Sequence, residues 1–329
     1  MSSHTGRQEI REKSAPDGRL VRPFDIVLDR LIDSGRNRSG AFFTYELSLR
    51  PDVPMTTPPD PTRASRLPRR IVCLTAESAD ILYALQSGDL VVGVSGYTVT
   101  PDEARRKPKI GAYTSVDFEK IFALNPDLVI AYSDLQADIT ATLARRGATV
   151  LHLNQRSLRD ILAAIAMIGA IVGRGAAADA LIARLEGEWA AIAAAAARLP
   201  RRPRVYFEEW DDPLISGIGW VSEAVALAGG DDVFGELSDR KVATGRIVSA
   251  DEVARRDPEI VFASWCGKKV RPERIAARPG WNRVTAVREG RIHEIKSAHI
   301  LQPGPVILRG MRQMADAIAA WGAIGNTLA

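Results

Sequence analysis

The chain has 329 residues, of which 46% are hydrophobic and 26% are charged, a composition typical of a globular protein with a buried core. Its formal net charge of +4 is small, and its arginine pairs are spread along the sequence. Nucleic-acid-binding proteins gather basic residues on one element. The sequence therefore argues against that class and predicts a solvated, weakly basic surface.

Neither a membrane span nor a secretory signal is predicted. The longest uncharged apolar run, residues 161–173, is too short to cross a bilayer and indicates a buried helix. The first residues are charged and lack an apolar stretch, so a cytoplasmic location is expected. Cys73 and Cys266 lie far apart in the sequence, and we expect two free thiols.

Residues 1–69 differ from the rest because they contain eight of the 19 prolines. Proline lacks an amide donor and restricts the residue before it, so this segment cannot form a regular helix or an inner strand. We predict a flexible leader, within which Met55 is an alternative start of translation.

From Arg70 onward, short apolar runs alternate with segments of helical periodicity. Such alternation is typical of right-handed βαβ units around a parallel sheet. The fold class is therefore α/β, with an N-terminal ligand-binding lobe over residues 70–155. Strands are predicted at 71–74, 91–94, 128–131 and 150–153, and helices at 79–85, 118–124 and 137–146.

A long helical region occupies residues 156–200. Apolar residues recur every three or four positions from Leu158, and the pattern resumes after Gly173 up to Pro200. A helix of about 23 residues is about 35 Å long. This length suits a connecting backbone helix between two lobes.

The strand–helix alternation then restarts, which predicts a C-terminal ligand-binding lobe over residues 201–329. Segment 249–263 repeats the pattern of segment 117–131: an acidic helix start, an apolar helix, Asn-Pro or Asp-Pro, and an apolar strand. Two similar halves imply two lobes with a ligand cleft between them. Strands are predicted at 204–207, 259–263 and 291–295, and a helix at 221–228.

Taken together, these motifs resemble the helical-backbone substrate-binding proteins of cobalamin, haem and siderophore ABC importers. The resemblance covers residues 70–321, and the motif Gly93–Tyr97 is most similar to the cobalamin-binding branch. It implies two Rossmann-like lobes with parallel sheets, joined by a long rigid helix that permits only small lobe movements. The motifs that carry it are RIVCLTAESADILYAL at 70–85, VVGV at 91–94, FEKIFALNPDLVIA at 118–131 and RGATV at 146–150.

The resemblance implies a monomeric binding protein, not an enzyme, that holds a cobalamin-like corrinoid for ABC-type uptake or intracellular handling. Members of that family are usually periplasmic or lipid-anchored, in contrast to the cytoplasmic location expected above. Two alternatives stay open: an iron-siderophore or haem-binding protein, and a cytoplasmic tetrapyrrole or metal-chelate enzyme on the same fold.

The resemblance also implies one acidic residue on each lobe that docks onto arginines of the importer permease. These positions fall on Glu119 and Asp251. The family usually has Glu at the second position, and Glu252 is a possible substitute there. Acids in the first turn of a helix are also favoured by the helix dipole, so a purely structural role is the alternative.

The loops at the carboxyl ends of the predicted strands are rich in aromatic residues, and such loops bind ligands in α/β proteins. Flat aromatic faces suit a large planar ligand such as a corrin ring, although each ring alone is equally expected to pack in the core. The predicted ligand-binding residues are Tyr97, Tyr113, Tyr132, Ser133, Trp210, Trp220, Trp265 and His299.

Cys266 and His299 are candidate cobalt ligands. Lys268 and Lys269 follow Cys266 and are expected to lower its pKa, with a structural thiol as the alternative. The acidic cluster Glu208–Asp212 is predicted to be a solvated loop rather than a metal or acid–base site. Convergence of this cluster with Cys266 and His299 in the cleft would favour the enzyme hypothesis.

Overall fold

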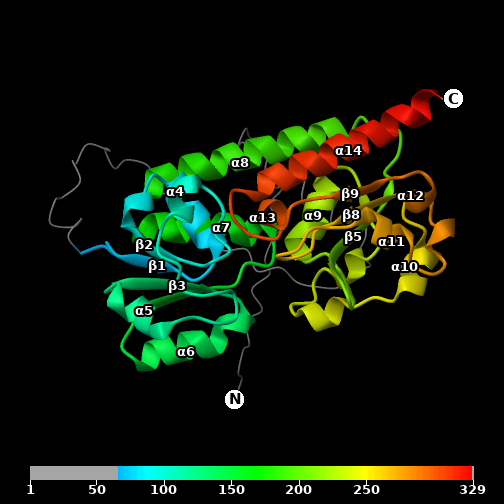
Figure 1. The fold of residues 1–329 in the computed structure, drawn as a ribbon. Coiled ribbons are helices and arrows are strands. Elements are labelled where there is room, and N and C mark those ends of the chain that lie inside the picture. Colours follow the sequence, from blue (N-terminus) through cyan, green and yellow to red (C-terminus); the bar gives the residue numbers. More distant parts are fainter. Residues whose placement is uncertain (1–65, 328–329) are drawn as a thin grey trace, which may run out of the picture. The chain divides into compact units, whose positions relative to one another are not determined.

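The computed structural model describes residues 66–327. The predicted leader, residues 1–69, lies almost entirely outside the described residues, and so does Met55. Figure 1 shows the described elements as two groups of strands and helices with long helices along one side.

The first group is built on a four-stranded parallel sheet in the order β2-β1-β3-β4. Its central strands are buried on both faces, which explains why they are continuous apolar runs. Its strands are β1 (Ile71–Cys73), β2 (Val91–Val94), β3 (Leu128–Tyr132) and β4 (Val150–Leu153), and its helices are α3 (Ala76–Ala84), α4 (Asp102–Arg105), α5 (Phe118–Ala123) and α6 (Ala137–Arg145).

The second group is built on the sheet β6-β5-β8-β9, in which the short β7 also pairs with β5. All its pairings are parallel except that of β5 with β6, which the sequence did not predict. Its strands are β5 (Arg204–Asp211), β6 (Leu214–Ser216), β7 (Asp231–Asp232), β8 (Ile260–Ala263) and β9 (Ile292–Glu294), and its helices are α9 (Gly219–Leu227), α10 (Ala250–Arg256), α11 (Pro272–Ala276), α12 (Thr285–Arg288), α13 (Ser297–Ile300) and α14 (Ile307–Thr327).

Two helices connect these groups: α7 (Leu158–Ile171) and α8 (Gly175–Ala196). A capping box of Ser157 and Asp160 begins α7, and Gly173, with a φ of +70°, follows its end. The 22 residues of α8 span about 33 Å. This helix packs on α7, on α9 and on α14, as Figure 1 shows.

The repeat predicted from the sequence folds in the same way in both halves, as α5–β3 and as α10–β8. Each helix is followed by a left-handed residue before proline: Asn125 with a φ of +46° and Asp257 with a φ of +45°. Asn and Asp tolerate this conformation better than other side chains.

An arginine at the start of the first strand of each half holds this turn: Arg70 directly precedes β1, and Arg204 is the first residue of β5. The Arg70 Nε donates to the carbonyl of Asn125 at 3.0 Å, and the Arg204 Nε donates to that of Asp257 at 2.8 Å. Each repeat therefore uses the same guanidinium contact to join a helix end to the neighbouring strand.

The last helix is anchored on the first half of the chain. The Val306 amide, just before α14, donates to the Asp80 carboxylate of α3 at 2.8 Å. A side chain at Gly304 would meet Glu77 and Asp80 at 3.2 Å, so glycine allows this close approach. The segment before α14 is thus fixed against α3.

The predicted fold class is confirmed: the chain is α/β, with two lobes built on sheets whose pairings are parallel except that of β5 with β6, and with a long helix. Within residues 66–327, no helix combines the length and the apolar character needed to span a bilayer.

Candidate ligand-binding pocket

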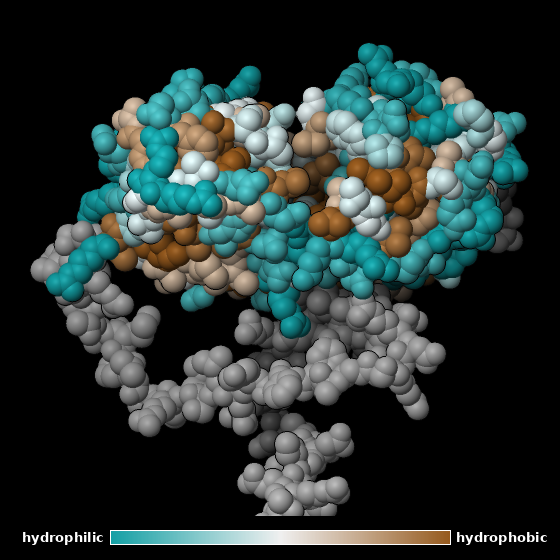
Figure 2. Space-filling view, turned by 90° about the horizontal axis from the view of Figure 1, so that it is seen from below, coloured by the Kyte–Doolittle hydropathy of each residue, from teal (hydrophilic) through white to brown (hydrophobic). Residues whose placement is uncertain are grey.

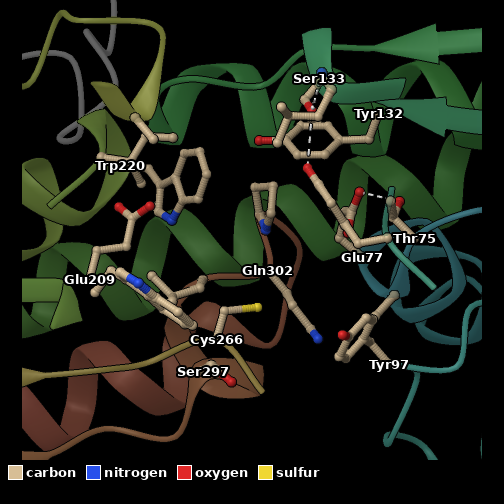
Figure 3. A pocket seen from close by; sticks show the side chains of 18 of the residues that line it. Thr75, Glu77, Tyr97, Tyr132, Ser133, Glu209, Trp220, Cys266, Ser297 and Gln302 are labelled. Carbon is tan, nitrogen blue, oxygen red and sulfur yellow. Dashed lines mark hydrogen bonds between the residues drawn. The ribbon is translucent and has the colours of Figure 1, made fainter. Parts of the chain in front are cut away.

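A cavity of about 640 Å³ is lined by loops from both sheets and by the segment around α13. This volume lies in the range of small-molecule binding sites. The first sheet contributes residues that follow β1, β2 and β3, and the second contributes residues from the β5–β6 hairpin and from the loop after β8. Figure 3 shows Glu77, Thr75 and Tyr97 on one side of the pocket and Trp220 and Glu209 on the other.

Most of the residues predicted to bind a ligand line this cavity. Trp220 is 2% exposed, and its Nε1 donates to the Ile300 carbonyl at 2.9 Å, which fixes the indole against α13. Tyr97, by contrast, is 45% exposed at the rim. The predicted residues that line the cavity are Tyr97, Tyr113, Tyr132, Ser133, Trp210, Trp220 and Cys266.

Large apolar side chains remain exposed around the rim. Besides Tyr97, they are Val99, Leu135 and Val242, which all line the cavity. Figure 2 shows apolar surface, in brown, at the hollow between the two halves. Exposed apolar patches commonly mark binding sites, so this rim favours a ligand with apolar faces.

Trp265 and His299 lie outside the cavity lining, which corrects the placement expected from the sequence. Trp265 is 2% exposed, packs in the core of the second lobe, and donates through Nε1 to Glu208 at 3.0 Å. His299 belongs to the single turn of α13, whose Ser297 and Ala298 line the cavity. Successive residues of a helix point in different directions, so the imidazole turns away from the cavity.

Ser133 is held in a backbone conformation that L-residues rarely adopt, with φ +63° and ψ 162°. Such a conformation costs about 1–3 kcal/mol and is typical of functional sites. The Ser133 hydroxyl accepts from the amide of Leu135 at 3.3 Å and is hydrogen-bonded to the Tyr113 hydroxyl at 3.0 Å. The strained turn therefore fixes a tyrosine in the pocket wall.

We expect the variant Ser133→Gly to be more stable than Ser133→Ala by about 1–3 kcal/mol, because both lack the hydroxyl and only glycine removes the strain. Urea denaturation of the two variants measures this difference in free energy. Equal stability of the two would contradict a strained backbone at this position.

The buried Gln136 was not predicted from the sequence, yet it orders two of the pocket tyrosines. Its Oε1 accepts from the Tyr132 amide at 2.9 Å, and its Nε2 donates to the Tyr113 carbonyl at 2.7 Å. The Tyr132 hydroxyl donates to the carbonyl of Gln155 at 3.1 Å. These bonds hold both rings in place.

The arginines of the pocket are already paired. Arg156 contacts Asp134 at 2.7 Å, and the buried Arg246 makes a two-pronged contact with Glu209 at 2.6 and 3.1 Å. Both guanidinium charges are therefore compensated, and the exposed Lys241 is the remaining basic residue of the described lining.

The expectation of a lowered pKa for Cys266 is wrong. Partial burial, and then the Glu209 carboxylate, raise the pKa of the Cys266 thiol. Lys268 does not counter this effect, because its ammonium group pairs with Asp211 and lies over the Trp210 ring. A protonated thiol is a poor metal ligand.

The acidic cluster Glu208–Asp212 is not a solvated loop, because β5 continues through Asp211 and pairs with β6. Glu208 is fully buried and binds Arg278 at 2.5 and 2.9 Å. Among residues 66–327, no three His, Cys, Asp or Glu side chains are placed to hold a metal ion. Glu208, Asp212 and His299 are not in the lining, so they do not converge with Cys266.

The two residues predicted to dock onto a permease occupy equivalent, exposed positions. Glu119 and Asp251 are each the second residue of their helix, α5 and α10. Glu119 pairs with Arg146 at 2.9 Å. Glu252, the possible substitute, pairs with Arg255 and with Arg256, which leaves Asp251 as the more available acid of the second lobe.

The sequences of two relatives align with most of the chain. An uncharacterized ABC transporter substrate-binding lipoprotein of Bacillus subtilis (strain 168) is 27% identical over 261 residues, covering 76% of this chain and 80% of the relative. A cobalamin-binding protein of Halobacterium salinarum is 28% identical over 274 residues, covering 80% and 74%. The lipoprotein name of the Bacillus relative does not support the cytoplasmic location expected from the sequence.

Two solved structures share the fold. A periplasmic vitamin B12 binding protein of Vibrio cholerae has a TM-score of 0.63 at 22% identity, covering 77% of this chain and 97% of that one. A periplasmic heme binding protein from Pseudomonas aeruginosa has a TM-score of 0.67 at 20% identity, covering 77% and 93%. These likenesses show the fold and leave the ligand open.

The model of one protein family, described as periplasmic binding protein, matches residues 71–298. Members of this family carry solutes and are not enzymes. This match spans more than half of the sequence and covers the lining residues of the cavity except Leu301, Gln302 and Pro303. The chain therefore belongs to the periplasmic binding protein family.

Proposed function

We propose that the chain binds a cobalamin-like corrinoid in this pocket and delivers it to an ABC importer. The observation that carries the proposal is a pocket with aromatic walls from both lobes whose arginines are already neutralised. Aromatic rings pack well on a flat macrocycle. The name of the Halobacterium relative supports this choice.

Charge favours a corrinoid over the alternatives. The edge of a corrin ring carries neutral carboxamides, whereas haem carries two carboxylates and many ferric siderophores are anionic. A buried anion needs cations or several donors to replace its hydration. Arg156 and Arg246 are engaged by Asp134 and Glu209, so they are poorly placed to neutralise such a ligand. Of the basic residues in the described lining, this leaves the exposed Lys241 to meet an anion.

Haem remains the second candidate because of Tyr97. Its side chain lies at the rim of the pocket and is 45% exposed. A tyrosine hydroxyl is a known axial ligand of haem iron. An iron-siderophore has no comparable feature in its favour here.

The test is titration of the purified full-length chain with cyanocobalamin, followed by calorimetry and tryptophan fluorescence. We expect one-to-one binding with micromolar affinity or tighter, and a loss of about 10–100-fold in Trp210→Ala, because central aromatic contacts carry much of the binding energy. Trp321→Phe, outside the pocket lining, is the matched control. Saturable binding of haemin with none of cyanocobalamin would reject the corrinoid.

The same titration with hydroxocobalamin tests axial ligation. We expect no shift of the absorbance bands, because Cys266 stays protonated and His299 lies outside the lining. A shift that disappears in Cys266→Ser would show instead that the thiol binds cobalt.

We also propose that Glu119 and Asp251 contact the permease of that importer. Their equivalent positions in the two repeats and their exposure support this role. The carboxylates stand in the first turns of α5 and α10, in a part of each lobe that does not line the pocket.

A further inference from the structure

Glu77 is the most deeply buried carboxylate that lines the pocket, with 3% of the residue exposed. It is the second residue of α3, and the Thr75 hydroxyl donates to its Oε1, as the dashed line in Figure 3 shows. Within residues 66–327, no arginine, lysine or histidine pairs with it. A carboxyl group facing a ligand pocket without a counter-ion calls for a functional explanation.

The neighbouring hydroxyl groups are committed to other partners. The Tyr113 hydroxyl is hydrogen-bonded to Ser133, and the Tyr132 hydroxyl donates to Gln155. Within the described residues, neither tyrosine hydroxyl is hydrogen-bonded to Glu77. The segment that approaches Glu77 from before α14 does so through Gly304, which carries no side chain.

We compared Glu77 with the titratable groups around it. Among these, Glu77 is the group of the pocket lining that is expected to change its charge near neutral pH. Burial, with a smaller contribution from the Asp80 carboxylate, raises the pKa of Glu77 to about 7, although the hydrogen bonds from the Thr75 hydroxyl and from its own amide oppose this rise. Burial also raises the pKa of Cys73 to about 12 and that of Tyr113 and Tyr132 above their usual value. Asp80, with a pKa of about 6, is turned to Val306 and Arg309.

A neutral carboxyl group offers one O–H donor and one carbonyl acceptor. A primary carboxamide offers the complementary pair, an acceptor and a donor in the same plane. In a pocket lined largely by apolar groups, such a pair of hydrogen bonds is worth more than in water. A carboxylate on the ligand, in contrast, would repel Glu77 whenever it is ionised.

We propose that Glu77 determines ligand specificity by binding, as a neutral carboxyl group, a peripheral carboxamide of the ligand. This inference rests on the proposed function, because corrinoids carry such amides around the ring. It explains why a carboxyl group with no counter-ion occupies this wall of the pocket.

The first measurement is calorimetric titration with cyanocobalamin at about pH 6 and about pH 8, in buffers of different ionisation enthalpy. At the higher pH, the complex should take up close to one proton, and the Kd should be about ten-fold weaker than at the lower pH. This follows because the free protein must protonate Glu77 before the amide can bind.

Three variants separate this role from a structural one. Glu77→Gln keeps a donor and an acceptor, so its Kd should not change with pH and its proton uptake should vanish. Glu77→Leu removes both groups, so its Kd should not change with pH and should be about ten-fold or more weaker than that of the wild type at about pH 6. Glu223→Gln is the matched control, because burial also raises the pKa of Glu223 to about 7 while the residue lies outside the lining; this variant should keep the ligand-linked proton uptake of the wild type.

The outcomes distinguish this inference from the proposed function. Tight cyanocobalamin binding without proton uptake, or with the same pH dependence in Glu77→Gln, overturns the role of Glu77 and leaves the corrinoid assignment standing. Absence of cyanocobalamin binding at either pH overturns both.

Discussion

Arg278→Met is expected to lower the free energy of unfolding by about 3–5 kcal/mol, the usual effect of removing one partner of a buried ion pair. Glu208 is fully buried in β5, and both of its oxygens bind the Arg278 guanidinium. The Trp265 indole donates a further bond to the same carboxylate. Without Arg278, this carboxylate stays in the core of the second lobe and loses both guanidinium contacts.

Chemical denaturation of the wild type, Arg278→Met and the double variant Glu208→Gln/Arg278→Met measures this effect. The double variant should recover part of the loss, because it leaves no buried charge. Arg271→Ala is the surface control: its contact with Glu273, at 3.8 Å, joins two exposed side chains and is worth about 0–1 kcal/mol. Equal stability of Arg278→Met and the wild type would contradict the buried pair.

Three buried carboxyl groups are expected to make the free energy of unfolding depend on pH. Their contribution should increase when the pH falls from about 8 to about 5. Burial raises the pKa of Glu77 to about 7, of Glu223 to about 7 and of Asp80 to about 6. In each case the folded chain binds a proton at a pH where the unfolded chain does not. The contribution to stability is therefore lowest above the folded pKa and is regained as the pH falls towards the unfolded value.

Glu77→Gln isolates one of these groups. At about pH 8 the variant should be more stable than the wild type by about 2–3 kcal/mol, because a rise from 4.5 to about 7 corresponds to about 3 kcal/mol. At about pH 5 the difference should shrink to within about 1 kcal/mol.

Denaturation curves for both proteins at the two pH values test this. The difference between them cancels the opposing effect of His293 and His299, whose pKa values burial lowers. It also cancels carboxylates such as Glu252, whose pKa of about 2 places its titration at lower pH. A variant that is less stable than the wild type at about pH 8 would show that the buried carboxylate stabilises the fold.

The sequence predicts the alternating elements well, because parallel strands buried on both faces are short apolar runs and their helices end at Gly, Asn-Pro or Asp-Pro. It does not predict the hairpin of β5 and β6. The run Glu208–Asp211 is acidic, and only the distant Arg278, Arg246 and Lys268 make its burial tolerable. Partners so far apart in the chain leave no local pattern.

The pocket residues could likewise be predicted only where their position does not depend on contacts between distant parts of the chain. Aromatic residues at strand ends were found because their position follows from the topology. Trp265 and Trp210 have the same local character, yet Trp265 packs in the core and Trp210 lines the cavity. Glu77 lies in the first turn of α3, shortly after β1, and could have been noticed as a polar group near a strand end, but its burial depends on residues beyond 300.

The hydrogen bond from the Val306 amide to the Asp80 carboxylate joins residues that are 226 positions apart in the sequence. It can therefore form only late in the synthesis of the chain. The first lobe leaves the ribosome early, but α3 gains this partner only when translation is almost complete. At about 5–20 residues per second, the delay is on the order of tens of seconds. During that time the pocket-facing end of α3 stays uncovered, so a chain ending before Gly304 should expose it permanently and be a better substrate for chaperones and proteases than the complete protein.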